Sequence, residues 1–164
     1  KHINRRQSFG HWEMDLVIGK AEGTGQALLV LTERKTRFEI IVKLPDKTAS
    51  SVVAALQKTI NQYPTQTFKT ITVDNGSEFS DYANMKQLVG EVYYCHPYCS
   101  SERGSNENAN KLVRRFFPKG KSMKYRKQSD CDAAARFING MHRRILGYRT
   151  AAELFAEELQ KLSG

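Results

Sequence analysis

Hydrophobic and polar side chains alternate along residues 11–19, HWEMDLVIG, in the pattern of a β-strand with one buried face. The apolar face carries Trp12, Met14, Leu16 and Ile18, and the opposite face carries His11, Glu13 and Asp15. Two more strands are predicted at 26–33 and 37–44, and the short RKT link between them is typical of a β-hairpin. The first three strands of the chain are therefore expected to pair antiparallel.

Helical periodicity begins after the third strand. Thr48 is the expected N-cap of a helix that runs to Tyr63, with Val52, Val53, Leu56 and Ile60 as its apolar stripe. A strand at 68–73 follows, and the helix before it allows a parallel crossover. A helix at 79–89, a strand at 91–96 and helices at 105–116, 129–144 and 150–162 complete the prediction. This order predicts an α/β fold, with a five-stranded mixed sheet of three antiparallel and then two parallel strands, flanked by helices.

Length and composition fit one folded domain with a strongly basic surface. The 164 residues are 40% hydrophobic, and we expect a basic leader at 1–10 followed by one domain at 11–164. The formal net charge is +9, and eight Lys or Arg but no Asp or Glu lie between Lys111 and Lys127. Such an excess favours a polyanionic partner, most often nucleic acid, although a basic run can also be a solvated face.

The remaining composition sets the expected cellular context. Three cysteines cannot all pair within one chain, which favours a reducing compartment. Cys95, His96 and Cys99 lack the second ligand pair of a structural zinc site. No apolar run is long enough to span a membrane and no signal peptide is evident, so a cytoplasmic location without a membrane partner is expected. Because the chain begins at Lys1 and not at Met, it is expected to be a piece of a longer protein.

Two aspartates occupy positions that favour chemistry over structure. Asp15 lies in the middle of the first strand, although aspartate is depleted in strands. Asp74 follows the fourth strand in TVDNGSEF, where Asn75 and Gly76 are expected to turn the chain toward a helix. Ligands of open α/β sheets bind at the carboxyl ends of strands. Asp15 on a solvent-facing edge is the alternative reading.

A third carboxylate, Glu107, lies in the first turn of the predicted helix 105–116. Lys111, Arg114 and Arg115 share its face, and Glu107 with Lys111 could form an ordinary surface ion pair. Three carboxylates from a strand centre, a strand end and a helix start can instead converge on a hard divalent cation such as Mg²⁺. Two such ions can promote phosphodiester displacement, with the neighbouring cations holding the DNA backbone.

Four segments, in this order, carry a family resemblance: GHWEMDLVIGK, LTERKTRFEIIVKLPDKTA, TVDNGSEF and RGSNENANKLVRRFFPKG. From His11 to about Leu159 the chain resembles the catalytic domain of the IS30 family of bacterial transposases, within the DDE transposase and retroviral integrase group. The resemblance implies a ribonuclease-H-like fold, with an N-terminal helix-turn-helix region of the family absent from this chain. It also implies homo-oligomeric complexes on transposon ends and target DNA, associated with the bacterial nucleoid.

The resemblance also implies the roles of individual residues. Asp15, Asp74 and Glu107 would be the catalytic triad that holds two Mg²⁺ or Mn²⁺ ions for cleavage of DNA ends and strand transfer. Basic residues one and two turns after the glutamate, here Lys111 and Arg114, would contact the DNA end.

Some assignments stay open at this point. Glu13, Asn75 and His96 are candidates to support the metal ligands, although Glu13 could be exposed and His96 could be structural. Tyr148 beside His142 and two arginines is a weak signal for a tyrosine recombinase. A DNA-binding or assembly module without catalysis, and a ribonuclease-H-like nuclease acting on RNA–DNA hybrids, are the competing functions.

Overall fold

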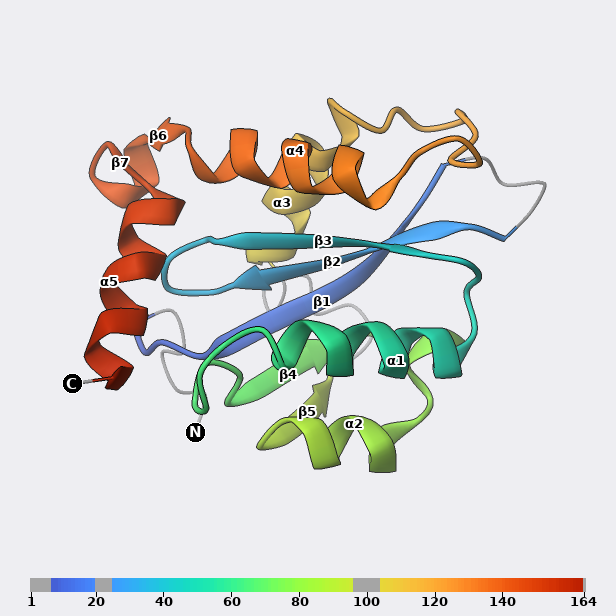
Figure 1. The fold of residues 1–164 in the computed structure, drawn as a ribbon, viewed down its shortest axis with the longest axis horizontal. Coiled ribbons are helices and arrows are strands. Elements are labelled where there is room, and N and C mark those ends of the chain that lie inside the picture. Colours follow the sequence, from blue (N-terminus) through green and yellow to red (C-terminus); the bar gives the residue numbers. More distant parts are fainter. Residues whose placement is uncertain (1–6, 20–24, 96–103, 164) are drawn as a thin grey trace.

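The computed structural model describes residues 7–19, 25–95 and 104–163, and the side chains of all of these except residues 104–107. The five strands of the main sheet are β1 (His11–Ile18), β2 (Ala27–Glu33), β3 (Glu39–Leu44), β4 (Thr70–Val73) and β5 (Glu91–Tyr94). They lie in the order β3-β2-β1-β4-β5, so that β1 is the central strand (Figure 1). β1, β2 and β3 pair antiparallel, whereas β4 pairs parallel with β1 and with β5. The predicted mixed sheet is confirmed.

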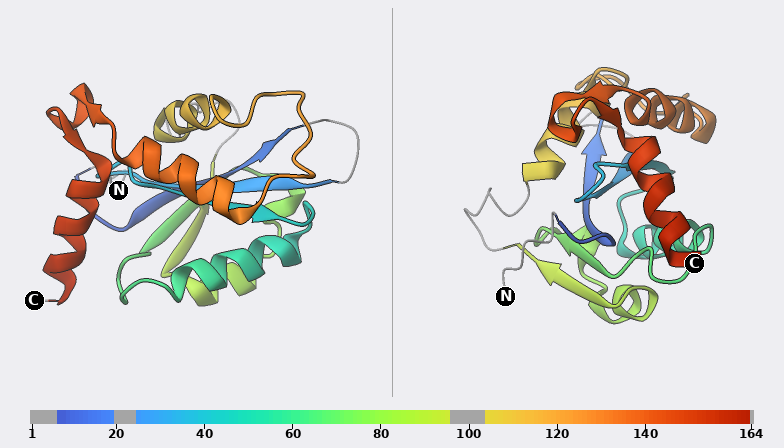
Figure 2. Two further views of the ribbon diagram at one scale, coloured as in Figure 1. Left: turned by 45° about the horizontal axis from the view of Figure 1, so that its top comes forward. Right: turned by 90° about the vertical axis from the view of Figure 1, so that its left-hand side faces the viewer.

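Helices cover both faces of this sheet. The helices are α1 (Ala49–Ile60), α2 (Tyr82–Leu88), α3 (Gly104–Arg114), α4 (Gln128–Asn139) and α5 (Ala151–Ser163). α3 and α4 lie above the sheet in the view of Figure 1 and α1 and α2 lie below it, while α5 stands at one end (Figure 2). This arrangement makes three layers, with the sheet between two layers of helices.

The alternation of side chains in the strands divides the core into two clusters. Trp12, Met14 and Leu29 belong to the cluster on the α1 side, which includes Phe155 from α5. Val17, Leu28 and Val30 belong to the cluster on the α3 and α4 side. All seven residues of β2 are buried, because both faces of this strand are covered. Trp12 is fully buried, as predicted.

Helix ends account for most boundary errors in the prediction. Thr48 is the N-cap of α1 as predicted, and its hydroxyl accepts a hydrogen bond of 3.2 Å from the Ser51 amide. α1 ends at Ile60, three residues before the predicted end at Tyr63. The predicted helix 79–89 is wrong at its start, because a 3₁₀ turn (η1, Ser77–Phe79) comes first and Asp81 then caps α2.

The predicted helix 129–144 is also too long. α4 ends at Asn139, and Gly140 occupies its C-cap. A small hairpin follows, made of β6 (His142–Arg143), a 3₁₀ turn (η3, Arg144–Leu146) and β7 (Arg149–Thr150). Gly147 and Tyr148, both with a φ of 64°, close this hairpin in the left-handed region.

Two side-chain amides of α4 hydrogen-bond to the outer edge of β3. Asn139 accepts from the Glu39 amide and donates to the Glu39 carbonyl, each at 2.9 Å. Gln128 accepts from the Lys43 amide and donates to the Ile41 carbonyl, also at 2.9 Å. These four bonds satisfy backbone groups that an edge strand otherwise presents to solvent.

Candidate active site

Asp15 lies at the centre of the sheet, halfway along β1. Its Oδ1 accepts a hydrogen bond of 2.8 Å from the Leu16 amide, and its Oδ2 accepts one of 2.9 Å from Nδ2 of Asn110 on α3. The side chain is half-buried and reaches the space between the sheet and α3. Asp15 is therefore held in one orientation by the strand itself and by a helix 95 positions later in the chain.

Asp74 follows the last residue of β4, the strand next to β1. The parallel register pairs Glu13 with Thr72, and extending it by two places brings Asp15 level with Asp74. Neighbouring strands lie roughly 4.8 Å apart, and residues paired in register point to the same face of a sheet. Extended in this way, the register of β1 and β4 would bring the two aspartates that the sequence singled out together at the carboxyl end of β4.

The turn after Asp74 brings a second carboxylate close to the first. The Gly76 amide donates a hydrogen bond of 2.8 Å to Oδ1 of Asp74. A Cβ atom at Gly76 would lie 3.0 Å from that same oxygen and would overlap the Glu78 carboxylate. Gly76 thus leaves room for both carboxylates, and Glu78 is a residue of this site that the sequence reasoning did not single out. Nδ2 of Asn75, which was singled out, donates to the Cys95 carbonyl at 3.4 Å.

Position 107 is described only by its backbone, in the first turns of α3. Three residues later on this helix, Asn110 makes its hydrogen bond to Asp15, which places this part of α3 beside the aspartate. Positions three apart lie on the same side of a helix. The backbone of position 107 therefore lies one turn from a direct contact with Asp15, while the Glu107 side chain lies outside the described residues. Asn110 is a site residue that sequence reasoning missed, although its spacing from Glu107 was visible.

The basic residues of α3 differ in exposure. Lys111 and Arg115 are exposed, whereas Arg114 is half-buried and its Nη1 donates to the Phe117 carbonyl at 3.4 Å. Burial lowers the pKa of the Arg114 guanidinium, which stays charged at neutral pH. Ala109, Val113 and Phe117 are buried on the opposite side.

The remaining candidate residues from the sequence that the structure describes lie in different environments. Glu13 is fully buried, and one of its oxygens lies 2.8 Å from Nε of Arg34, so the reading of Glu13 as an exposed residue is wrong. His96 lies outside the described residues, as does Cys99. Tyr148 is 67% exposed on the β6–β7 hairpin.

The donor set at this site suits a hard divalent cation. Carboxylate oxygens are the preferred ligands of Mg²⁺, and Asp15 and Asp74 provide two carboxylates on adjacent strands. Among the residues whose side chains are described, no group of three His, Cys, Asp or Glu side chains could hold a metal ion. The chemistry of the two aspartates thus fits a divalent cation that keeps several water ligands.

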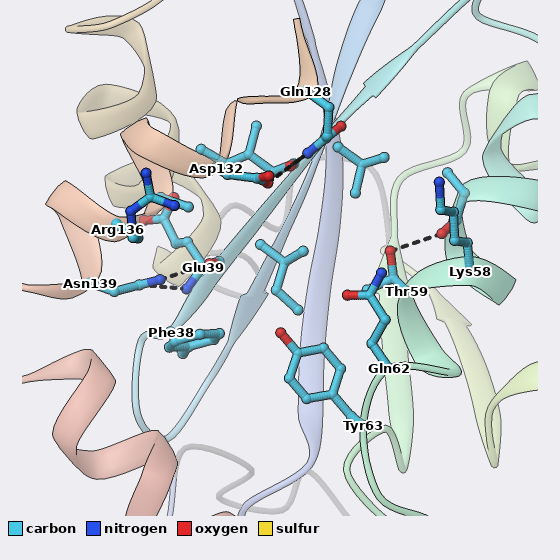
Figure 3. A pocket seen from close by; sticks show the side chains of 15 residues that line it. Phe38, Glu39, Lys58, Thr59, Gln62, Tyr63, Gln128, Asp132, Arg136 and Asn139 are labelled. Carbon is cyan, nitrogen blue, oxygen red and sulfur yellow. Dashed lines mark hydrogen bonds between the residues drawn. The ribbon is translucent and has the colours of Figure 1, made fainter. Parts of the chain in front are cut away.

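A cavity of about 350 Å³ lies at the opposite edge of the sheet, between β3, α1 and α4. Neither aspartate of the site lines it, and Glu39, Arg136 and Tyr63 do (Figure 3). The Glu39 side chain is 1% exposed, and neither of its carboxylate oxygens has a hydrogen-bond partner among the described residues. Burial raises the pKa of the Glu39 carboxyl to about 8, an increase that the Arg143 guanidinium opposes only in part.

Comparison with protein families gives one match, to the integrase core domain, over residues 5–100. The matched range includes both aspartates and ends before α3. No helix within the described residues is both long and apolar enough to cross a membrane.

Three curated relatives are named as transposases. The chain is 42% identical over 155 residues to the probable transposase for insertion-like sequence element IS1161 of Streptococcus salivarius, covering 94% of this chain and 44% of the relative. It is 35% identical to the transposase for IS1086 of Cupriavidus metallidurans, covering 96% and 46%. Identity to transposase InsI of IS30A from Escherichia coli K12 is also 35%, covering 94% and 40%. The chain thus spans less than half the length of these relatives.

Two solved structures with the same architecture are a retroviral integrase core and a chain of a viral intasome. The catalytic core domain of BIV integrase superposes with a TM-score of 0.72 at 19% identity, covering 94% of this chain and 99% of that one. A chain of the simian T-cell lymphotropic virus intasome, in complex with a PP2A regulatory subunit, gives 0.74 at 18% identity, covering 94% and 57%. These likenesses confirm the predicted ribonuclease-H-like fold.

Proposed function

Because the chain belongs to the integrase core domain family, among relatives that are transposases of the IS30 type, we propose that it is the catalytic core of a DNA transposase. In this proposal it cleaves phosphodiesters at the ends of a mobile element and joins the freed 3′-hydroxyls to target DNA. The active complex would be a homo-oligomer on DNA, because two ends have to be processed together.

One observation carries the proposal. Asp15 and Asp74 come from positions 59 residues apart in the sequence, and the parallel pairing of β1 with β4, recorded as far as Glu13 and Thr72, supports placing them side by side when it is extended by two residues. The hydrogen bond from Asn110 to Asp15 also brings α3 to this site. Glu107, one turn before Asn110, is the proposed third carboxylate.

We assign these three carboxylates to two divalent cations, Mg²⁺ or Mn²⁺. Bound there, the cations would supply charge stabilisation at the scissile phosphate and a more reactive attacking oxygen. The protein's own contribution is orientation. The Leu16 amide and Asn110 hold Asp15, and the Gly76 amide holds Asp74, so the oxygens need little reorganisation when a cation arrives.

The basic face of α3 is proposed to hold the DNA. Lys111 and Arg115 are exposed and can reach phosphates, while Arg114 is partly committed to the Phe117 carbonyl and contributes mainly through its charge. Glu13, Asn75 and His96 are proposed to support the ligands indirectly; for Glu13 this means fixing β1 through its ion pair with Arg34.

The test is cleavage and strand joining on labelled oligonucleotides that carry the element's ends, in the protein that contains this chain. Asp15→Asn, Asp74→Asn and Glu107→Gln should each reduce both reactions to background with Mg²⁺ or Mn²⁺, while duplex binding persists. Asp132→Asn is the matched control, because this exposed aspartate on α4 bonds only to Gln128 among the described residues.

Each outcome bears on a stated function. Retained cleavage by any of the three variants would refute its assignment as a catalytic ligand. If the wild type binds DNA but joins no strands under any divalent metal, the chain is a binding or assembly module. Preferential cutting of RNA–DNA hybrids would instead identify a ribonuclease-H-like nuclease.

A further inference from the structure

Residues 118–127, which lie in the segment between α3 and α4, are the most basic described part of the chain, and we call them the basic loop. It reads PKGKSMKYRK, with five Lys or Arg and no acidic residue. A stretch of this composition is ordinarily a flexible, solvated connection. The structure instead attaches it to the sheet at several points.

The middle of the basic loop packs against the end of β1. The Gly120 amide donates a hydrogen bond of 2.7 Å to the Gly19 carbonyl. Met123 is 4% exposed and belongs to the same core cluster as Val17. A Cβ at Gly19 would overlap the Lys121 carbonyl and lie 2.8 Å from Cγ of Met123, so the two segments are in direct contact.

The end of the basic loop is fixed by β3 and by the residues that follow α3. Nζ of Lys43 donates to the Arg126 carbonyl and, at 3.5 Å, to the Lys124 carbonyl. The Arg126 guanidinium lies 5.3 Å from the centre of the Phe117 ring. Arg126 therefore helps to hold the loop in place.

The other four cations of the basic loop project outward. Lys119, Lys121, Lys124 and Lys127 are all exposed. Within the described part of the chain none of them has a carboxylate at ion-pair distance, whereas Lys35 pairs with Glu158 at 2.6 Å and Arg149 pairs with Glu157. Uncompensated charge on an ordered backbone is suited to a polyanion, because little conformational entropy remains to be lost on binding.

Tyr125 adds a planar side chain to the same surface. It is 82% exposed, the highest exposure among the large hydrophobic side chains described, and Nζ of Lys124 lies 5.5 Å from its ring centre. Exposed aromatic rings among cations stack on bases and sugars in nucleic-acid-binding surfaces.

We propose that the basic loop is a second DNA-contact surface, which binds the sugar-phosphate backbone beyond the cleavage site. Its anchor at Gly19 lies four residues along β1 from Asp15, about 13 Å at the usual rise of a strand. With roughly 3.4 Å per nucleotide, this corresponds to contact about four nucleotides from the scissile phosphate. That location rests on the proposed function, whereas backbone binding by the loop does not.

Salt-dependent binding tests the loop directly. Fluorescence anisotropy with a labelled duplex, in chelator and without divalent metal, would compare wild type with the variant Lys119→Ala/Lys121→Ala/Lys124→Ala. We expect at least tenfold weaker binding near 0.1 M salt, and a slope of log affinity against log salt smaller by about 2 to 3. The corresponding triple Lys→Arg variant should bind like wild type.

The matched control removes the same charge outside the basic loop. Lys47→Ala/Lys58→Ala/Lys161→Ala changes exposed lysines near and on α1 and on α5. Equal effects of the two triple alanine variants would overturn the proposal, because only net charge would then matter. Phosphate-ethylation interference should show contacts about four nucleotides from the cut that the loop variant loses; an unchanged pattern would also overturn it.

These outcomes are separable from failure of the proposed function. If the loop variant binds DNA as tightly as wild type and Asp15→Asn is inactive in cleavage, only the loop contact is overturned. If the loop variant binds DNA weakly and Asp15→Asn still cleaves DNA, the catalytic assignment of Asp15 is overturned and the loop contact is supported.

Discussion

Replacing Glu39 with glutamine should remove much of the pH dependence of folding stability between pH 5 and 8. Burial in the region where α4 covers β3 raises the pKa of this carboxyl from 4.5 to about 8. Between these two values the folded state holds a proton that the unfolded state has released. The contribution of Glu39 to stability is thus fully present below pH 4.5 and is lost as pH rises toward 8.

The magnitude follows from the width of this window. Each pH unit inside it changes the free energy of unfolding by about 1.4 kcal/mol, so the whole window from pH 4.5 to 8 amounts to roughly 5 kcal/mol. Glutamine has nearly the shape of protonated glutamic acid and does not ionise. The variant should therefore gain stability relative to wild type as pH rises, with the difference levelling off above about pH 8.

Urea unfolding at pH 5, 6, 7, 8 and 9 measures this difference. Trp12, the only tryptophan in the sequence and fully buried, provides the fluorescence signal. Glu91→Gln is the control, because the Tyr82 hydroxyl lowers the pKa of Glu91 and its titration lies below this range. Parallel wild-type and Glu39→Gln curves from pH 5 to 8 would refute the reasoning, and ¹³C NMR titration of the Glu39 carboxyl gives an independent value.

Four further expectations concern the site and the core. Asn110→Leu removes the bond to the aspartate on β1 and should slow DNA cleavage roughly ten- to hundredfold, with duplex binding unchanged in the same anisotropy assay. Gly76→Ala forces a Cβ against two carboxylates and should lower both cleavage rate and melting temperature; unchanged values would contradict the turn geometry. Arg34→Met leaves the Glu13 carboxylate buried without its ion-pair partner and should cost about 3 to 5 kcal/mol in urea unfolding, a loss that Glu13→Gln in the same chain should partly restore. Burial raises the pKa of the Cys131 thiol to about 12, so it should react with a disulfide reagent at pH 8 only as fast as the protein unfolds.

The strands were predictable because local patterns determine them. The alternation in β1 and the continuous apolar run of β2 report directly on how many faces each strand buries. The helix ends were less predictable, since Asp81 starts α2 and Gly140 ends α4 through local caps that compete with apolar periodicity. Helix propensity favours a longer helix at both of these ends, and a single capping residue is enough to stop the helix there.

The proximity of the two candidate aspartates was predictable only as far as the order of the strands implies how neighbouring strands are aligned. Asp15 and Asp74 could be paired in advance because a strand centre and the end of its parallel neighbour meet in this kind of sheet. Asn110 was missed because its bond spans 95 positions and its local sequence is that of an ordinary polar helix face. The sequence around Glu39 does not mark it as buried, because the helix that covers it lies about 90 positions later.

The amide bonds from Gln128 and Asn139 to β3 also affect how copies of this protein can meet. An open sheet edge is a template on which strands of other chains can assemble, and it is a common starting point for aggregation and amyloid growth. Each of these amides offers a donor and an acceptor in the manner of a peptide group, so α4 takes the place of a sixth strand at both ends of β3. A protein proposed to gather in several copies on DNA, at high local concentration, thereby keeps this edge from joining copies into a continuous sheet.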